Sequence, residues 1–102
     1  MRPIHIAQLD KTRPVLVLTR DVARSVLVNV SVVPITSRVR GLAVEVAVGP
    51  ANGLDQTSVV NCDNIVTIPV ASLGRQIGAL LSEQESALTE AILAAYDLDW
   101  PQ

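Results

Sequence analysis

Aromatic and sulfur-containing side chains are scarce in this chain of 102 residues. Phe is absent, and Tyr, Trp, His, Cys and Met occur once each. A single Cys excludes an internal disulfide, and one Cys with one His leaves too few ligands for a zinc site. The core therefore has to come from Val, Ile, Leu and Ala. A hydrophobic fraction of 49% is enough to build such a core and argues against disorder.

Long apolar runs are also missing. No run approaches the roughly 20 residues that a helix needs to cross a bilayer. Residues 1–10 contain Arg, His, Gln and Asp, which is not the pattern of a secretory signal. We therefore expect a cytoplasmic protein that does not associate with a membrane. Its length suits one core, so we expect a single domain over residues 1–102.

The charges are divided unevenly along the chain. The formal net charge is −2, but residues 1–50 carry seven basic and three acidic side chains, whereas residues 51–102 carry one basic and seven acidic side chains. Seven of the eight basic residues are Arg, whose planar guanidinium fits phosphate oxygens better than the point charge of Lys. The low net charge argues against indiscriminate nucleic-acid binding, but the division permits one basic face.

Val-rich segments fill the first seventy residues and favour short strands. We predict strands at residues 3–9, 13–19, 26–34, 42–48 and 57–62, and a short sixth strand at 76–80. Between them we expect a polar turn or one helical turn at 20–24 and a basic loop at 37–41. Short strands at regular spacing predict a mainly β fold, a small curved antiparallel barrel with one terminal helix.

The Ala- and Leu-rich end of the chain predicts that helix. Ser82 and Glu85 have the spacing of a capping box that would open it. Leu88, Ile92 and Ala95 recur at helical spacing and would form its buried stripe. We expect Trp100, which comes after the helix, to anchor the terminus or a partner.

Two strand edges carry polar groups that suit an anion. Arg13 stands just before the apolar run of residues 15–18, and Thr36 and Ser37 stand just after the run that ends at Ile35. A guanidinium beside two hydroxyls suits an anion, above all a phosphate. Taken singly, each signal is more typical of a solvated strand edge or a turn.

A third segment, residues 58–68, interrupts an apolar run with polar side chains from Asn61 to Asn64. The simpler interpretation is a turn built on side-chain hydrogen bonds of Asn or Asp. The alternative is a polar wall of a cleft, in which Asp63 would orient Arg13 or act as a base. We interpret Cys62 as a small buried hydrophobic residue and His5 as a packed or interface residue.

Three motifs in this order resemble the MazF/PemK/Kid-type toxins, the endoribonucleases of toxin–antitoxin systems. They are T-R-P-V-L-V-L-T at residues 12–19, V-P-I-T-S at 33–37 and S-V-V-N-C-D-N-I-V-T-I at 58–68. The resemblance implies an SH3-like barrel with a C-terminal helix that forms a homodimer. It also implies cleavage of single-stranded RNA at specific sequences without a metal or cofactor, by attack of the neighbouring 2′-hydroxyl, leaving a 2′,3′-cyclic phosphate.

The resemblance assigns catalysis first to Arg13 and Thr36, with Ser37 at the next motif position and Asp63 as a second candidate. Donors from Arg13 and Thr36 would stabilise the charge that develops on the phosphoryl oxygens. RNA contacts are expected from the polar residues of the motifs and the basic loop, namely Thr12, Thr19, Arg20, Arg38, Arg40, Asn61 and Asn64.

The chain departs from the family pattern in two ways that affect recognition. Residues 10–12 nearly delete the long polar loop that relatives carry between their first two strands. His5 occupies a position usually held by Trp, and Asn61, Asn64 and Val66 replace an Arg, a Gln and an Arg of the third motif.

The resemblance implies a partner as well, a MazE-like antitoxin with an acidic, apolar tail. It would cover the Arg-rich face and compete with RNA for Arg13, Arg38 and Arg40. Two other functions remain open on the sequence: a toxin of the same fold that acts on a protein such as gyrase, and an inactive binding module. The gyrase-poisoning branch lacks the Arg–Thr pair, whereas the lost loop and Val66 favour the binding module.

Overall fold

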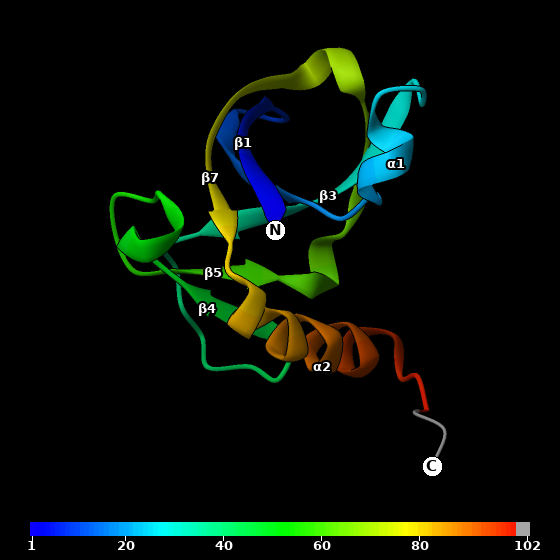
Figure 1. Ribbon diagram of the computed structural model, residues 1–102. Coiled ribbons are helices and arrows are strands. Elements are labelled where there is room, and N and C mark those ends of the chain that lie inside the picture. The colour runs from blue at the N-terminus through cyan, green and yellow to red at the C-terminus, as the bar shows by residue number, and fades with distance from the viewer. Residues whose placement is uncertain (100–102) are drawn as a thin grey trace.

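The computed structural model describes residues 1–99, so the expectation for Trp100 lies outside the described residues. One strongly curled antiparallel sheet of seven strands carries a 12-residue helix, α2 (Glu85–Tyr96), near its C-terminal end (Figure 1). The strands are β1 (Arg2–Gln8), β2 (Thr12–Val17), β3 (Asn29–Thr36), β4 (Glu45–Val48), β5 (Ser58–Asn61), β6 (Val66–Pro69) and β7 (Leu73–Leu80). The mainly β fold with one C-terminal helix is as predicted.

Short helical segments occupy several of the connections. They are α1 (Asp21–Arg24) and the 3-10 turns η1 (Pro50–Asn52), η2 (Cys62–Asn64), η3 (Val70–Ser72) and η4 (Ser82–Gln84). Of the two alternatives given for residues 20–24, a polar turn or one helical turn, the structure has the helical turn α1. Among residues 1–99, no helix has both the length and the apolar character needed to cross a membrane.

β3 is the strand that pairs with three others, and it changes partner along one of its edges. One edge of β3 pairs with β2, while its other edge pairs first with β6, over residues 29–32, and then with β5, over residues 35–36. Pro34, which has no N–H to donate, stands between the β6 and β5 segments. The strand order β4-β5-β3-β2-β1-β7 continues outwards from this strand.

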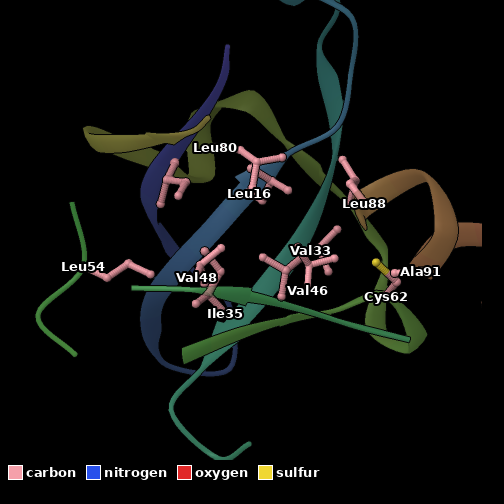
Figure 2. Packing of buried hydrophobic residues seen from close by; sticks show 12 residues of the cluster. Leu16, Val33, Ile35, Val46, Val48, Leu54, Cys62, Leu80, Leu88 and Ala91 are labelled. Carbon is pink, nitrogen blue, oxygen red and sulfur yellow. The ribbon is translucent and has the colours of Figure 1, made fainter. Parts of the chain in front are cut away.

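Alternating Val, Ile and Leu residues make β2 and β3 apolar on both faces. Leu16 and its partner Val33 belong to the larger cluster, which also takes in Leu88 and Ala91 from α2 (Figure 2). Val17 and its partner Val32 belong to a second cluster, which is completed by Ala7, Val15, Val30 and Ile68. This alternation explains how a chain without Phe fills its core, because the medium-sized Val side chains are used on both faces.

The two edge strands, β4 and β7, are linked through η1 rather than through a strand ladder. Gly53 has a φ of +87°, and a Cβ at that position would meet the carbonyl of Ile77. A Cβ at Gly78 would likewise collide with the carbonyl oxygen of Asn52. The backbones therefore approach closely only because both positions are Gly.

Asn52 adds hydrogen bonds to the same junction. Its side chain is 2% exposed, and its Nδ2 donates to the Ala79 carbonyl at 3.0 Å and to Gln84 Oε1. Its Oδ1 accepts from the Gly49 N–H at 3.0 Å. The buried amide therefore joins η1, β7 and η4 with its polar atoms paired, which is what a buried amide requires.

Several predicted strand boundaries were wrong. The third strand begins at Asn29 rather than at residue 26, because the N–H groups of Val26 and Leu27 bond to the Ala23 carbonyl at the end of α1. The fourth strand begins at Glu45 rather than at residue 42, and the last strand is longer than 76–80. β6 was missed, because only one of its four residues is buried and its pattern does not stand out.

The predicted capping box was also wrong. α2 begins at Glu85 after η4, and Gln84 Oε1 accepts the Leu81 N–H at 2.8 Å in the role assigned to Glu85. Glu85 Oε2 instead accepts a hydrogen bond from Arg2 Nε at 3.0 Å, and this ion pair connects α2 to β1. The predicted stripe is confirmed, with Leu88 buried and Ile92 and Ala95 packed on the core.

We expect Gly78→Ala to destabilise the fold, because the added Cβ has to displace the backbone carbonyl of Asn52. Over-packing of this kind costs about 2–3 kcal/mol, or roughly 10 °C in the melting temperature of a domain of this size. Gly49→Ala is the matched control, since its Cβ would make an ordinary 3.7 Å contact with Thr57. Equal melting temperatures for the two variants would show that the Gly78 contact does not hold the sheet closed.

Candidate functional site

The β2–β3 register brings the two predicted strand edges together. Val15 pairs with Pro34, Leu16 with Val33 and Val17 with Val32. Extending this antiparallel register by two residues places Arg13, at the start of β2, opposite Thr36, at the end of β3. Directly opposed residues on neighbouring antiparallel strands lie on the same face. The two side chains are therefore neighbours although 23 positions separate them in the sequence.

Arg13 and Thr36 both line a cleft of about 670 Å³ at this end of the curled sheet. Ile6, Pro14, Ile35 and Ser37 form the side of the cleft nearest to them. The chain after η1, as far as the first residue of β5, contributes Gly53, Leu54, Asp55, Gln56 and Ser58. The strand β7 contributes Arg75, Gln76 and Ile77, and the β1–β2 connection contributes Lys11. The tight junction at Gly53 and Gly78 therefore fixes the far wall.

Arg13 has a buried nitrogen that no group of residues 1–99 satisfies. Its Nη2 lies 3.3 Å from Asp10 Oδ1, in an ion pair whose Asp10 side chain is 76% exposed. Its Nε is buried and has no hydrogen-bond partner among residues 1–99. Leaving a buried N–H unpaired costs about 1–3 kcal/mol, so an anionic acceptor brought to Arg13 would relieve that cost.

Thr36 is held so that its hydroxyl has a proton to donate. Its Oγ1 accepts the N–H of Arg38 at 3.1 Å. A hydroxyl that accepts from the backbone keeps its own hydrogen for another acceptor. Thr36 and Arg13 thus present hydrogen-bond donors from two adjacent strands, and Ser37 adds a second hydroxyl on the same rim.

The sequence-based reasoning missed six polar residues of the cleft, namely Lys11, Asp55, Gln56, Ser58, Arg75 and Gln76. Arg75 is exposed on β7, and Asp55 and Gln56 follow η1. Arg75 is the one basic residue in the acidic half of the chain, which was a signal that could have drawn attention to it. The far wall cannot be derived from local sequence, because it exists only where η1 meets β7.

The polar residues in the middle of the segment 58–68 form a turn between β5 and β6, which is the simpler of the two interpretations given for them. Asn61 Oδ1 accepts the Asp63 N–H at 2.9 Å and caps η2. Only Ser58 of this segment lines the cleft, and Asp63 lies beyond the other end of β5, in η2. In the alternative interpretation Asp63 would orient Arg13 or act as a base, but the ion pair of Arg13 is with Asp10.

Cys62 and His5 behave as packed residues. Cys62 is fully buried in the larger core cluster, and burial followed by the charge of Asp63 raises the pKa of its thiol to about 11. A thiol with that pKa is almost entirely protonated at neutral pH, which makes it a poor nucleophile. His5 Nδ1 donates to the Gly74 carbonyl at 2.9 Å, at an irregularity between β1 and β7.

Comparison with known proteins agrees with this geometry. Residues 3–96 match the family model described as "PemK-like, MazF-like toxin of type II toxin-antitoxin system". The chain belongs to this toxin family. It is 69% identical over 100 residues to "Endoribonuclease MazF3" of Mycobacterium tuberculosis, which covers 98% of this chain and 97% of the relative. "Probable endoribonuclease MazF5" of the same species is 37% identical over 86 residues, covering 83% and 79%.

Solved structures of the family have the same fold. "Mycobacterium tuberculosis toxin MazF-mt6" superposes with a TM-score of 0.95 at 69% identity, covering 97% of this chain and 100% of that chain. A second structure, "Endoribonuclease in complex with its cognate antitoxin from Mycobacterial species", gives a TM-score of 0.86 at 26% identity, covering 97% and 95%. The MazF-like fold therefore extends over nearly the whole chain.

The family motifs fall into two places on this MazF-like fold. The first and second motifs meet at the cleft, whereas Asn61, Asp63 and Asn64 of the third motif lie outside it. Thr12 donates its hydroxyl to Gln8 Oε1 at 2.7 Å on the β1–β2 hairpin. The hairpin is short, as predicted, and residues 9–11 connect its two strands.

The other residues predicted to contact RNA lie on two further surfaces. Thr19 and Arg20 line a second, more open hollow together with Asn29, Ser31 and Thr67. Thr19 Oγ1 accepts the Ser31 N–H at 2.8 Å there. Arg38 and Arg40 are exposed on the β3–β4 loop, which begins directly after Thr36 and Ser37.

Proposed function

We propose that this chain is the toxin of a type II toxin–antitoxin system and that it cleaves single-stranded RNA at specific sequences. The observation that carries the proposal is Arg13 opposite Thr36 in one cleft, with the buried Nε of Arg13 unpaired within the described part of the chain. The names of the MazF relatives, which are 69% and 37% identical, support the same reaction. Cleavage of cellular RNA would inhibit translation and growth, and we propose that the protein acts in the cytoplasm.

The proposed reaction is an in-line attack on the scissile phosphate. The 2′-oxygen of the preceding ribose forms a bond to phosphorus while the bond from phosphorus to the 5′-oxygen of the next nucleotide breaks. One proton leaves the 2′-hydroxyl, and one proton is taken up by the departing 5′-oxygen. The products carry a 2′,3′-cyclic phosphate and a 5′-hydroxyl, so no water, metal or cofactor takes part in the balance.

Arg13 and Thr36 act on the phosphoryl oxygens in this scheme. Negative charge on those oxygens increases in the transition state, and fixed donors aimed at them lower the barrier. Arg13 acts as a charge stabiliser because its guanidinium keeps its proton at any ordinary pH. Thr36 donates its hydroxyl hydrogen, because its oxygen is already held by the Arg38 N–H.

The geometry favours Asp55 over Asp63 as the group that accepts the 2′-proton. Asp55 is the one carboxylate lining the cleft among residues 1–99. A general base has to reach the proton directly or through one water. Arg75, Lys11 and Ser37 would then hold the flanking nucleotides, since they line the same cleft. We propose further RNA contacts for Arg38 and Arg40.

The proposed partners are a second copy of the chain and an antitoxin. One MazF-like structure at 26% identity is titled as a complex with its cognate antitoxin, which supports a toxin–antitoxin pair here. An acidic, apolar tail would suit the exposed arginines Arg38, Arg40 and Arg75 and would exclude RNA from the cleft. Salt should weaken such a complex, because exposed charges are screened.

We expect Arg13→Ala to lower the rate of RNA cleavage by about 10²- to 10³-fold, the usual effect of removing one donor to a developing oxyanion. The fold should survive, because the lost ion pair with Asp10 is exposed and such pairs contribute roughly 0–1 kcal/mol. Cleavage should be measured with purified protein in EDTA, with the 3′ ends analysed for cyclic phosphate. Full activity of Arg13→Ala would refute the role of Arg13, cleavage that needs a metal would refute the proposed mechanism, and failure of the wild type to cleave RNA would refute the proposed function.

A matched pair of variants tests the choice of base. Asp55→Asn should reduce kcat by about 10²-fold or more, because general-base catalysis contributes about 10²- to 10⁴-fold. Asp63→Asn should leave kcat near the wild-type value, since Asp63 lies outside the cleft. Both residues are exposed, so neither change should unfold the protein. If Asp63→Asn were the less active of the two variants, Asp63 and not Asp55 would be the base.

A further inference from the structure

An acidic side chain lies inside the most basic loop of the molecule. The β3–β4 loop, residues 37–44, contains Arg38 and Arg40, and Glu45 follows it as the first residue of β4. The Glu45 carboxylate accepts the N–H groups of Arg40, at 3.2 Å to each oxygen, of Gly41, at 2.8 Å, and of Leu42, at 3.1 Å. Three successive amides therefore converge on one carboxylate.

The backbone of the loop is shaped for this contact. Gly41 has a φ of +75°, in the left-handed region, and a left-handed residue within a turn is what directs successive N–H groups to one point. Hydrogen bonds to an ionised acceptor are about twice as strong as those between neutral groups. The Glu45 N–H returns a bond to the Leu42 carbonyl at 3.1 Å.

Few other contacts determine the shape of this loop. At its beginning the N–H of Arg38 bonds to Thr36 Oγ1, and the N–H of Val39 bonds to the Ser37 carbonyl at 3.1 Å. Residues 37–43 are exposed, so no core contact fixes them. The main chain of Glu45, in contrast, is anchored in the sheet opposite Asn61. At the end of the loop the Val44 carbonyl accepts the Cys62 N–H at 2.9 Å. The Glu45 side chain thus connects the rigid sheet to residues 40–42, in the basic part of the loop.

We propose that Glu45 is a positioning residue, whose carboxylate holds the β3–β4 loop in the conformation that presents Arg38 and Arg40 to the RNA entering the cleft. The proposal rests on the proposed function. The positioning role and the charge of Glu45 predict opposite changes in RNA binding when the carboxylate is neutralised. As a negative charge, Glu45 repels RNA phosphates, so its neutralisation would tighten binding if charge were its only role. As a positioning residue, its neutralisation weakens binding.

Glu45→Gln separates the two roles by the sign of the change in KM. With the carboxylate neutralised, we expect the loop to hold its competent conformation about a tenth of the time, which raises KM about tenfold. The value of kcat should change by less than about threefold, because the backbone of Thr36 stays paired with Val59. The substrate is a single-stranded RNA oligonucleotide containing a cleavage site mapped for the wild type.

Two further variants control the experiment. Glu90→Gln removes the same charge from an exposed position on α2 and should leave KM within about twofold of the wild-type value. Gly41→Ala keeps Glu45 but strains the left-handed backbone, where an added Cβ would meet no other atom within 4 Å. It should raise KM in the same direction as Glu45→Gln, which a defect confined to the Glu45 side chain would not do.

Amide hydrogen exchange supplies a readout that needs no RNA. The N–H groups of Arg40, Gly41 and Leu42 should be protected in the wild type and should exchange faster in Glu45→Gln. Unchanged protection, or an unchanged or lower KM, would overturn the positioning role. Failure of the wild type to cleave RNA would refute the proposed function instead, and the exchange rates would still decide whether Glu45 holds the loop.

Discussion

The register between β2 and β3 is the constraint on which the rest of the molecule depends. It sets Leu16 against Val33 on one face and Val17 against Val32 on the other, and so divides the core into its two clusters. A slip of one residue would exchange the faces of every side chain in one strand. The same register carries Arg13 to the position opposite Thr36, so the stability of the core and the geometry of the cleft are fixed together.

The far wall of the cleft depends on a different contact. The sheet is not closed by a ladder between β4 and β7, and the close approach at Gly53 and Gly78, with the buried amide of Asn52, takes its place. This junction sets Asp55 and Arg75 across the cleft from Arg13 (the curl of the sheet appears in Figure 1). Glycine is needed here for space, and the function of the cleft depends on that space.

Local sequence predicted the parts of the structure that local physics determines. The alternation of apolar residues gave the main strands, and the stripe of Leu88, Ile92 and Ala95 gave the buried face of α2. The hydroxyls at the end of β3 and the guanidinium at the start of β2 were found from the residues and from the family motifs. Their position opposite each other needed no more than an antiparallel register.

The features that sequence reasoning missed depend on tertiary contacts. Asp63 stands among polar residues and so looked catalytic, but it lies in η2, which the Asn61 side chain caps, and it does not line the cleft. Glu85 had the spacing of a capping residue, but Arg2 attracts it from 83 positions away. Asp55 carries no local signal and Arg75 carries only a compositional one, because the contact between η1 and β7 is what brings them to the cleft. No pattern marks Glu45, since its partners are backbone amides.

The central claim is that the guanidinium of Arg13, together with Thr36, receives the scissile phosphate. The most direct test is nitrogen NMR of the arginine Nε–H groups during titration with an RNA oligonucleotide whose scissile nucleotide lacks the 2′-hydroxyl and cannot be cleaved. We predict that the Arg13 Nε–H resonance shifts on binding while that of Arg24, which already bonds to the Thr19 carbonyl, does not. Binding that leaves the Arg13 resonance in place, with shifts confined to residues around Thr19 and Ser31, would contradict the claim.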